Sequence, residues 1–138
     1  MKISNQINIE SSLENIWSKT VDVEAWPKWN PAMKKITIQG EGEFSLGSRA
    51  LIYQEGMGAV VWTVSAFEQA KVFAWETRVF GMKMVATHEL SVVEGSVINN
   101  LSIEVGGIMG AILAPLLKGK LLQALVAENE NFKKFCES

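Results

Sequence analysis

The stretch VINNLSIEVGGIMGAILAPLLKGKL, residues 97–121, decides the fold, because the spacing of its apolar side chains changes in the middle. Before the glycine pair at 106–107, apolar and polar residues alternate, as is typical of a half-buried strand. After the pair the apolar period becomes 3.6, which predicts a helix of about 30 residues. Its apolar stripe consists of Leu113, Leu117, Leu121, Ala124, Leu125, Glu128, Phe132 and Phe135. Pro115 is tolerated only near a helix start, so we expect the first turns to be kinked or separate.

The period of two extends backward through the middle of the chain. Runs rich in Val, Ile, Thr, Phe and Trp lie near residues 33–39, 48–54, 59–67, 72–80, 82–93 and 97–105. The turns between them are short, and short connections join antiparallel neighbours, since a parallel crossover needs about a dozen residues or more. Residues 3–9 alternate in the same way and predict a seventh strand.

Two short helices are predicted after the first strand. Ser11 and Glu14 have the spacing of a capping box, in which the Ser11 hydroxyl accepts from the Glu14 amide. Asp22 can cap a second helix, which Pro27 and Pro31 keep short because neither has an amide hydrogen to donate.

These elements predict an α+β domain that spans residues 1–138. A helix that follows six strands has to bury its stripe on the only large apolar surface available, which is the concave face of the sheet. The expected fold is therefore a seven-stranded curved antiparallel sheet wrapped around the long C-terminal helix.

Composition narrows the range of partners. The net charge is −2 and the basic residues are scattered, so nothing favours nucleic acid. One histidine and one cysteine give no support for a metal site, and no glycine loop for a nucleotide is present, so we expect no cofactor. The single cysteine suits a reducing cytoplasm. The run from Gly106 to Leu117 is shorter than the roughly 20 residues of a membrane span, and no secretion signal is recognised.

The order of elements resembles the START and birch-pollen-allergen superfamily, and within it the polyketide cyclase/dehydrase-like SRPBCC group. The segments that carry this resemblance are Ile9–Trp17, DVEAWPKWNP (22–31), LGSRALIYQ (46–54), VWTV (61–64), FAWETR (73–78), ATHEL (86–90) and the terminal helix ending in KKFCE. The resemblance implies a helix-grip fold with a ligand cavity between sheet and helix. It also implies that Ala50, Ile52 and Gln54 point inward. Lipid carriers, hormone receptors and cyclases all occur in this group.

Strand parity then gives the candidate site. Val60, Trp62, Val64 and Ala66 share one face, as do Phe73, Trp75, Thr77 and Val79, then Met84, Ala86, His88 and Leu90, and finally Val97, Asn99, Leu101 and Ile103. We expect the ligand to contact Gln54, Trp62, Trp75, Thr77, His88, Leu90, Asn99, Leu117 and Leu121. Polar members of this set would orient a ligand in an apolar cavity, or else pair with one another or with water.

Three functions are compatible with this site. The first is non-enzymatic binding of a small hydrophobic molecule, such as a lipid, an isoprenoid or a polyketide-like compound. The second is an aromatic polyketide cyclase or dehydratase in which His88, expected to titrate near neutral pH, acts as acid and base. The third is a protein-interaction module that uses residues 108–117, through which a homodimer would also form. Binding ranks first because His88 is the only inward group expected to titrate near pH 7.

Overall fold

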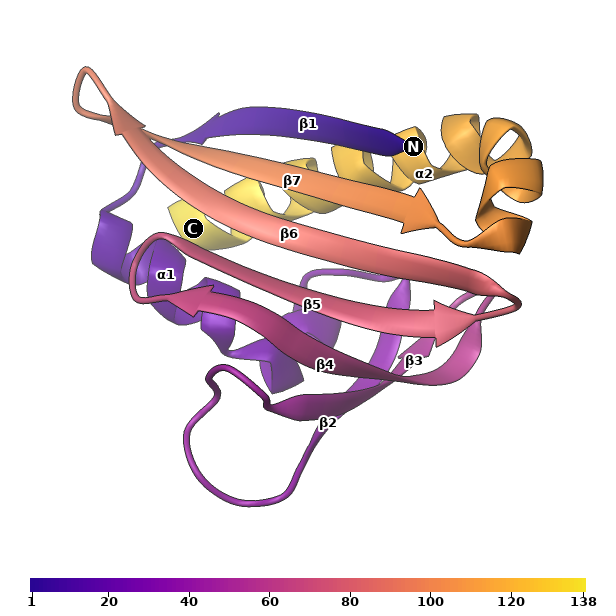
Figure 1. Cartoon of the computed structure of the whole chain (residues 1–138). Coiled ribbons are helices and arrows are strands. Elements are labelled where there is room, and N and C mark those ends of the chain that lie inside the picture. The colour runs from indigo at the N-terminus through magenta and orange to yellow at the C-terminus, as the bar shows by residue number, and fades with distance from the viewer.

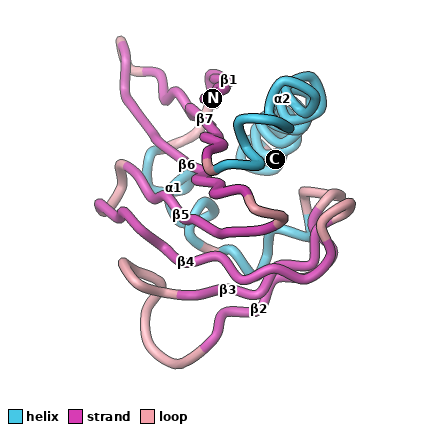
Figure 2. The backbone as a smooth tube through the Cα atoms, turned by 45° about the vertical axis from the view of Figure 1, so that its right-hand side comes forward, coloured by secondary structure: helices cyan, strands magenta, loops and turns pink.

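The computed structural model describes all residues, Met1–Ser138, and contains the predicted seven-stranded antiparallel sheet. The strands are β1 (Lys2–Ile9), β2 (Met33–Gln39), β3 (Arg49–Gln54), β4 (Gly58–Glu68), β5 (Val72–Val79), β6 (Met82–Val93) and β7 (Ser96–Gly106). Their order across the sheet is β1-β7-β6-β5-β4-β3-β2, so the first two strands form opposite edges. Figure 2 shows the sheet curving around the long helix α2 (Ile108–Glu137), which confirms the helix-grip fold.

Glycine is needed where β7 turns into α2. Gly107 has φ of +88°, and a Cβ at this position would lie 2.9 Å from the carbonyl oxygen of Gly81 in the β5–β6 turn. A side chain would therefore be strained by the backbone angle and would also clash with the neighbouring hairpin. The change of period at this glycine pair in the sequence thus coincides with a turn that requires glycine.

Two short helices cover one end of the sheet: α1 (Leu13–Val21) and the 3-10 helix η1 (Val23–Lys28). The predicted cap of α1 is wrong by one residue, because Ser12 caps the helix and its hydroxyl accepts from the Asn15 amide at 3.1 Å. Ser11 instead accepts from the Asn15 side chain. No side-chain bond caps η1, although Asp22 precedes it as predicted.

The sheet has two register irregularities, one on β2 between Met33 and Lys35 and one on β4. The register between β4 and β5 shifts between Val64 and Ala66, which marks a bulge. Ala66 is therefore exposed, contrary to the predicted parity, and Phe67 turns toward the core. The Phe67 ring packs edge-on against Trp17 of α1, with ring centroids 5.7 Å apart.

Helix α2 lies closest to β1 and β7, at one side of the curved sheet. It is continuous through Pro115, and Figure 1 shows its first turns bending away from the axis of the rest. The kink follows from the proline, which lacks an amide hydrogen and crowds the preceding turn. Because α2 packs on β1 and β7, space remains between the helix and strands β3–β6.

Candidate functional site

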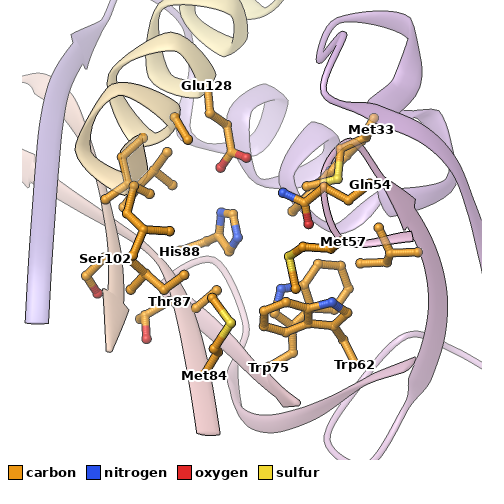
Figure 3. A pocket seen from close by; sticks show the side chains of 18 residues that line it. Met33, Gln54, Met57, Trp62, Trp75, Met84, Thr87, His88, Ser102 and Glu128 are labelled. Atoms are coloured by element: carbon orange, nitrogen blue, oxygen red, sulfur yellow. The ribbon is translucent and has the colours of Figure 1, made fainter. Parts of the chain in front are cut away.

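This space is a cavity of about 90 Å³, shown in Figure 3. A single water molecule needs only about 10–15 Å³, so the cavity has room for a small organic molecule. Most of its 18 lining residues are hydrophobic. They are Trp26, Met33, Ile52, Gln54, Met57, Trp62, Trp75, Met84, Ala86, Thr87, His88, Leu101, Ser102, Ile103, Leu121, Ala124, Leu125 and Glu128.

Tryptophans from three elements form the aromatic wall. Trp26 of η1 contacts Trp75 of β5 edge-on at 5.3 Å between centroids, and Trp62 of β4 lies 6.1 Å from Trp75. The Trp26 indole donates to the Thr20 carbonyl at 3.2 Å. By contrast, the indole Nε1 of Trp62 is buried and has no hydrogen-bond partner. The wall therefore contains a buried hydrogen-bond donor without a partner.

His88 is enclosed by aromatic rings. It stacks on Phe73 at 4.7 Å and lies 5.0 Å from Trp26, and only 7% of its surface is exposed. Burial lowers its pKa from 6.5 to about 3, because no anion or hydrogen bond compensates for the lost solvation of the charged ring. The expectation that His88 titrates near neutral pH is therefore wrong. Its imidazole is neutral there and offers one donor and one acceptor.

Glu128 of α2 is the titratable group that the sequence argument did not place in the site. Its Oε1 accepts from the Asn30 side chain at 3.0 Å, and Asn30 is in turn oriented because its Oδ1 accepts from the Ala32 amide. Burial raises the pKa of Glu128 from 4.5 to about 7, an effect the Asn30 hydrogen bond reduces only in part. In the sequence the signal was a lone acid in the apolar stripe of α2.

The predicted site residues divide into two groups. The cavity wall brings together Gln54, Trp62, Trp75, His88 and Leu121. The remaining four, Thr77, Leu90, Asn99 and Leu117, lie outside this wall. Ligand contacts by these four residues stay predictions.

The polar atoms of two residues in the second group bond to other parts of the protein. The Thr77 hydroxyl donates to the Val61 carbonyl at 2.8 Å, which ties β5 to β4. The Asn99 amide donates to Asn129 Oδ1 at 2.8 Å, while Asn99 Oδ1 is buried without a partner. Asn99 faces a separate void of about 10 Å³ that His88 and Glu128 also line. A void of that size is close to the space of one water molecule.

The start of α2 presents an apolar surface outside the cavity. Ile108, Ile112 and Leu116 are strongly exposed, with 60% of Ile112 and 76% of Leu116 accessible. In length and composition α2 resembles a membrane-crossing helix, but here it is the core helix of the fold. The homodimer expected through residues 108–117 stays a prediction.

Metal-binding side chains are not grouped anywhere in the structure. Cys136 is buried, and burial raises the pKa of its thiol to about 11. A thiol with that pKa is a poor nucleophile at neutral pH, because the thiolate is the reactive form.

Comparison with known proteins agrees with this architecture. The model of the family "Polyketide cyclase / dehydrase and lipid transport" matches residues 1–137. Among solved structures, ginseng major latex-like protein 151 from Panax ginseng has a TM-score of 0.80 at 14% identity, covering 100% of this chain and 98% of its own. A START superfamily protein from Mycobacterium smegmatis has a TM-score of 0.71 at 18% identity, covering 97% and 98%.

The Zhui aromatase/cyclase from a Streptomyces species has a TM-score of 0.74 at 13% identity, covering 99% of this chain and 93% of its own. At such low identities these structures show a shared fold alone. No curated protein sequence is similar enough to this chain to count as a match.

Proposed function

Because the chain belongs to the polyketide cyclase/dehydrase and lipid transport family, we propose that it binds a small hydrophobic molecule between the sheet and α2. The observation that carries the proposal is the cavity of about 90 Å³, with three tryptophans and three methionines in its wall. Binding would be driven by removal of apolar surface from water, worth roughly 25 cal/mol per Å². A single cysteine cannot form an internal disulfide and suits a reducing compartment, so the cytoplasm is the expected location.

Leu121→Trp tests this proposal, because Leu121 lines the cavity from the helix side. The added indole would fill the space and abolish binding of apolar ligands, at a cost in stability of about 1–3 kcal/mol from overpacking. Binding is read from quenching of the cavity tryptophans and from calorimetry. The matched control is Leu116→Trp, which adds the same ring to an exposed position on the same helix. Equal binding by both variants would place the ligand elsewhere.

A second candidate is acid–base catalysis of a cyclase or dehydratase type. It is favoured by Glu128, whose pKa of about 7 suits proton transfer near neutral pH, and which shares the cavity with His88. The description of the family, which names polyketide cyclase and dehydrase, is compatible with this reaction class. In this candidate mechanism Glu128 would transfer the proton, in place of His88 as expected from the sequence. The neutral His88 imidazole would form a hydrogen bond to a substrate oxygen.

Two conservative variants separate these candidates. Under catalysis, Glu128→Gln should lower turnover by roughly 10²–10⁴, the usual contribution of a general acid or base. His88→Gln keeps hydrogen-bonding capacity and should weaken binding only by the worth of one neutral contact, about 0.5–1.5 kcal/mol. A polyketide-like substrate that binds but is never converted by the wild-type protein would leave binding as the function.

A further inference from the structure

Trp62, His88 and Glu128 are among the polar side chains of the cavity with hydrogen-bonding atoms that no protein group uses. The side chains of Gln54, Thr87 and Ser102 also line it. Trp62 Nε1 is buried and unpartnered, and only 4% of this residue is exposed. The His88 imidazole is held by ring contacts alone. Glu128 uses Oε1 for Asn30 and leaves Oε2 free. A buried polar atom without a partner, such as Trp62 Nε1, is destabilising, so a ligand that pairs with it gains affinity.

The charge of the cavity limits the ligand class. Its lining contains no lysine or arginine, and Glu128 is the only acid. A carboxylate or phosphate inside it would lose its hydration without gaining a cation and would face Glu128. Fatty acids and lipids with anionic headgroups are therefore poor candidates for this cavity.

The two sides of the cavity can form hydrogen bonds with different groups of a ligand. Figure 3 shows Glu128 and His88 on one side and Trp62 on the other. An indole N–H is a donor only, and a carbonyl oxygen satisfies it without bringing a second donor. A neutral imidazole beside a carboxyl group offers both donors and acceptors, and a hydroxyl group matches both.

We propose that the cavity recognises an uncharged aromatic molecule with a carbonyl oxygen at Trp62 and a hydroxyl group at Glu128 and His88. The indoles of Trp26 and Trp75 provide the apolar aromatic surface against which its ring packs. This inference rests on the proposed binding function and specifies the class of ligand.

Protonation of Glu128 supplies a signature of this arrangement. The groups that face Glu128 from η1, β3, β6 and β7 include a single other titratable one, His88, whose pKa of about 3 keeps it neutral over the range of interest. Asn30 contributes an uncharged hydrogen bond. Below its pKa of about 7 Glu128 can donate and accept, and above it the carboxylate only accepts. A ligand hydroxyl can bond to both forms, whereas an ether oxygen can bond only to the protonated form.

The test uses a matched set of small probes with the intact protein, measured by calorimetry and tryptophan quenching below and above the Glu128 pKa. The parent probe is p-(hydroxymethyl)acetophenone, and p-(methoxymethyl)acetophenone blocks its hydroxyl group. We expect the ether to bind about 2- to 10-fold more weakly above that pKa than below it, the worth of one hydrogen bond, while the alcohol keeps its affinity. Glu128→Gln should remove the pH dependence of the ether.

The carbonyl end is tested with p-ethylbenzyl alcohol, which lacks the ketone. It should bind the wild-type protein about 2- to 10-fold more weakly than the parent probe, and Trp62→Phe should abolish that difference. Thermal melts establish that each variant is folded.

Three results would overturn the inference. The first is an affinity for the ether that does not change with pH, and the second is a preference for the ketone that persists in Trp62→Phe. The third is tighter binding of p-acetylbenzylamine than of the parent probe, which would indicate a cationic ligand paired with Glu128. If p-ethyltoluene, which has no polar group, binds as well as the parent probe, the cavity is a hydrophobic binding site but this ligand class is wrong. If none of the probes binds, the proposed function fails together with the inference.

Discussion

The two halves of α2 differ in how they are held on the same sheet. In the C-terminal half, Asn129, Phe132 and Cys136 are buried, and Asn129 donates to the carbonyl and side-chain oxygens of Asn5 on β1. Further along, Lys133 donates to the Asn8 carbonyl at 2.7 Å. These polar contacts fix the helix on the edge of the sheet.

The N-terminal half has no such side-chain hydrogen bonds, although the Met109 amide donates to the Gly81 carbonyl at 3.3 Å. Ile112 and Leu116 face solvent, while Leu121 lines the cavity. Apolar contacts over a cavity are less costly to separate than buried hydrogen bonds, so local opening is expected on this side. The comparison indicates that one helix combines a fixed anchor with a cover for the cavity.

Loss of the anchor should have the largest effect. Asn129→Ala removes the bonds to Asn5 and Asn99 and leaves the buried Asn99 amide without a partner. We expect a loss of about 2–4 kcal/mol in the free energy of unfolding, measured by urea denaturation. Gln123→Ala, an amide-to-alanine change on the exposed face of the same helix, should stay within about 0.5 kcal/mol of wild type. Equal losses in both variants would mean that Asn129 is not an anchor of α2.

The pH dependence of stability tests the part of α2 next to this anchor, where Glu128 lines the cavity together with His88. The pKa of Glu128 is raised from 4.5 to about 7, so between these values the folded protein keeps a proton that the unfolded chain has lost, and stability falls as pH rises. The pKa of His88 is lowered from 6.5 to about 3, so its contribution falls as pH decreases through that window. Between pH 4.5 and 6.5 the two slopes oppose each other.

Glu128→Gln removes one of these slopes. We expect the variant to gain about 1–3 kcal/mol as pH rises from 4.5 to 6.5, while the wild-type protein changes little. Urea unfolding over a pH series measures both. In the double variant with His88→Gln, the free energy of unfolding should again change little over this pH range. If it also changed little in Glu128→Gln alone, the result would contradict the burial of His88.

Period and turn chemistry predicted the fold closely, because each strand alternates and each connection is short. The exceptions are the bulge on β4 at Ser65 and the register shift on β2 between Met33 and Lys35. Each changes which residue faces inward, and no local pattern signals it. Proline at 115 correctly indicated a kink. The cap of α1 was predicted one residue too early, because Ser11 and Ser12 are equally suitable caps in the sequence.

The site was harder to predict, because parity shows which face of a strand a side chain lies on but not where along the strand the cavity is. Thr77 and Trp75 share a face, yet only Trp75 reaches the cavity, because the Thr77 hydroxyl bonds to the neighbouring strand. The low pKa of His88 comes from burial, and one of the rings that surround it, Trp26, is far away in the sequence. Glu128 lies in the apolar stripe of α2 in the sequence, but its place in the cavity wall depends on how α2 is positioned on the sheet, which the sequence pattern alone does not give.

The smallest effect is expected on the exposed start of α2. Ile112→Ala should change the free energy of unfolding by no more than about 0.5 kcal/mol, since the side chain is mostly in solvent. Ile112→Glu extends the test to assembly, because a charge in an apolar interface is costly. If the homodimer forms through this surface, sedimentation should show a dimer for the wild-type protein and a monomer for Ile112→Glu. A larger loss of stability in a monomeric protein would mean that this part of α2 is not a loosely held cover.

Native mass spectrometry of the protein purified from its own cells tests the binding cavity most directly. We expect the wild-type protein to carry a small apolar molecule that adds a defined mass and is lost on denaturation. Leu121→Trp, purified in the same way, should lack this mass, and Leu116→Trp should retain it. The same bound mass on folded Leu121→Trp would contradict a ligand site between the sheet and α2.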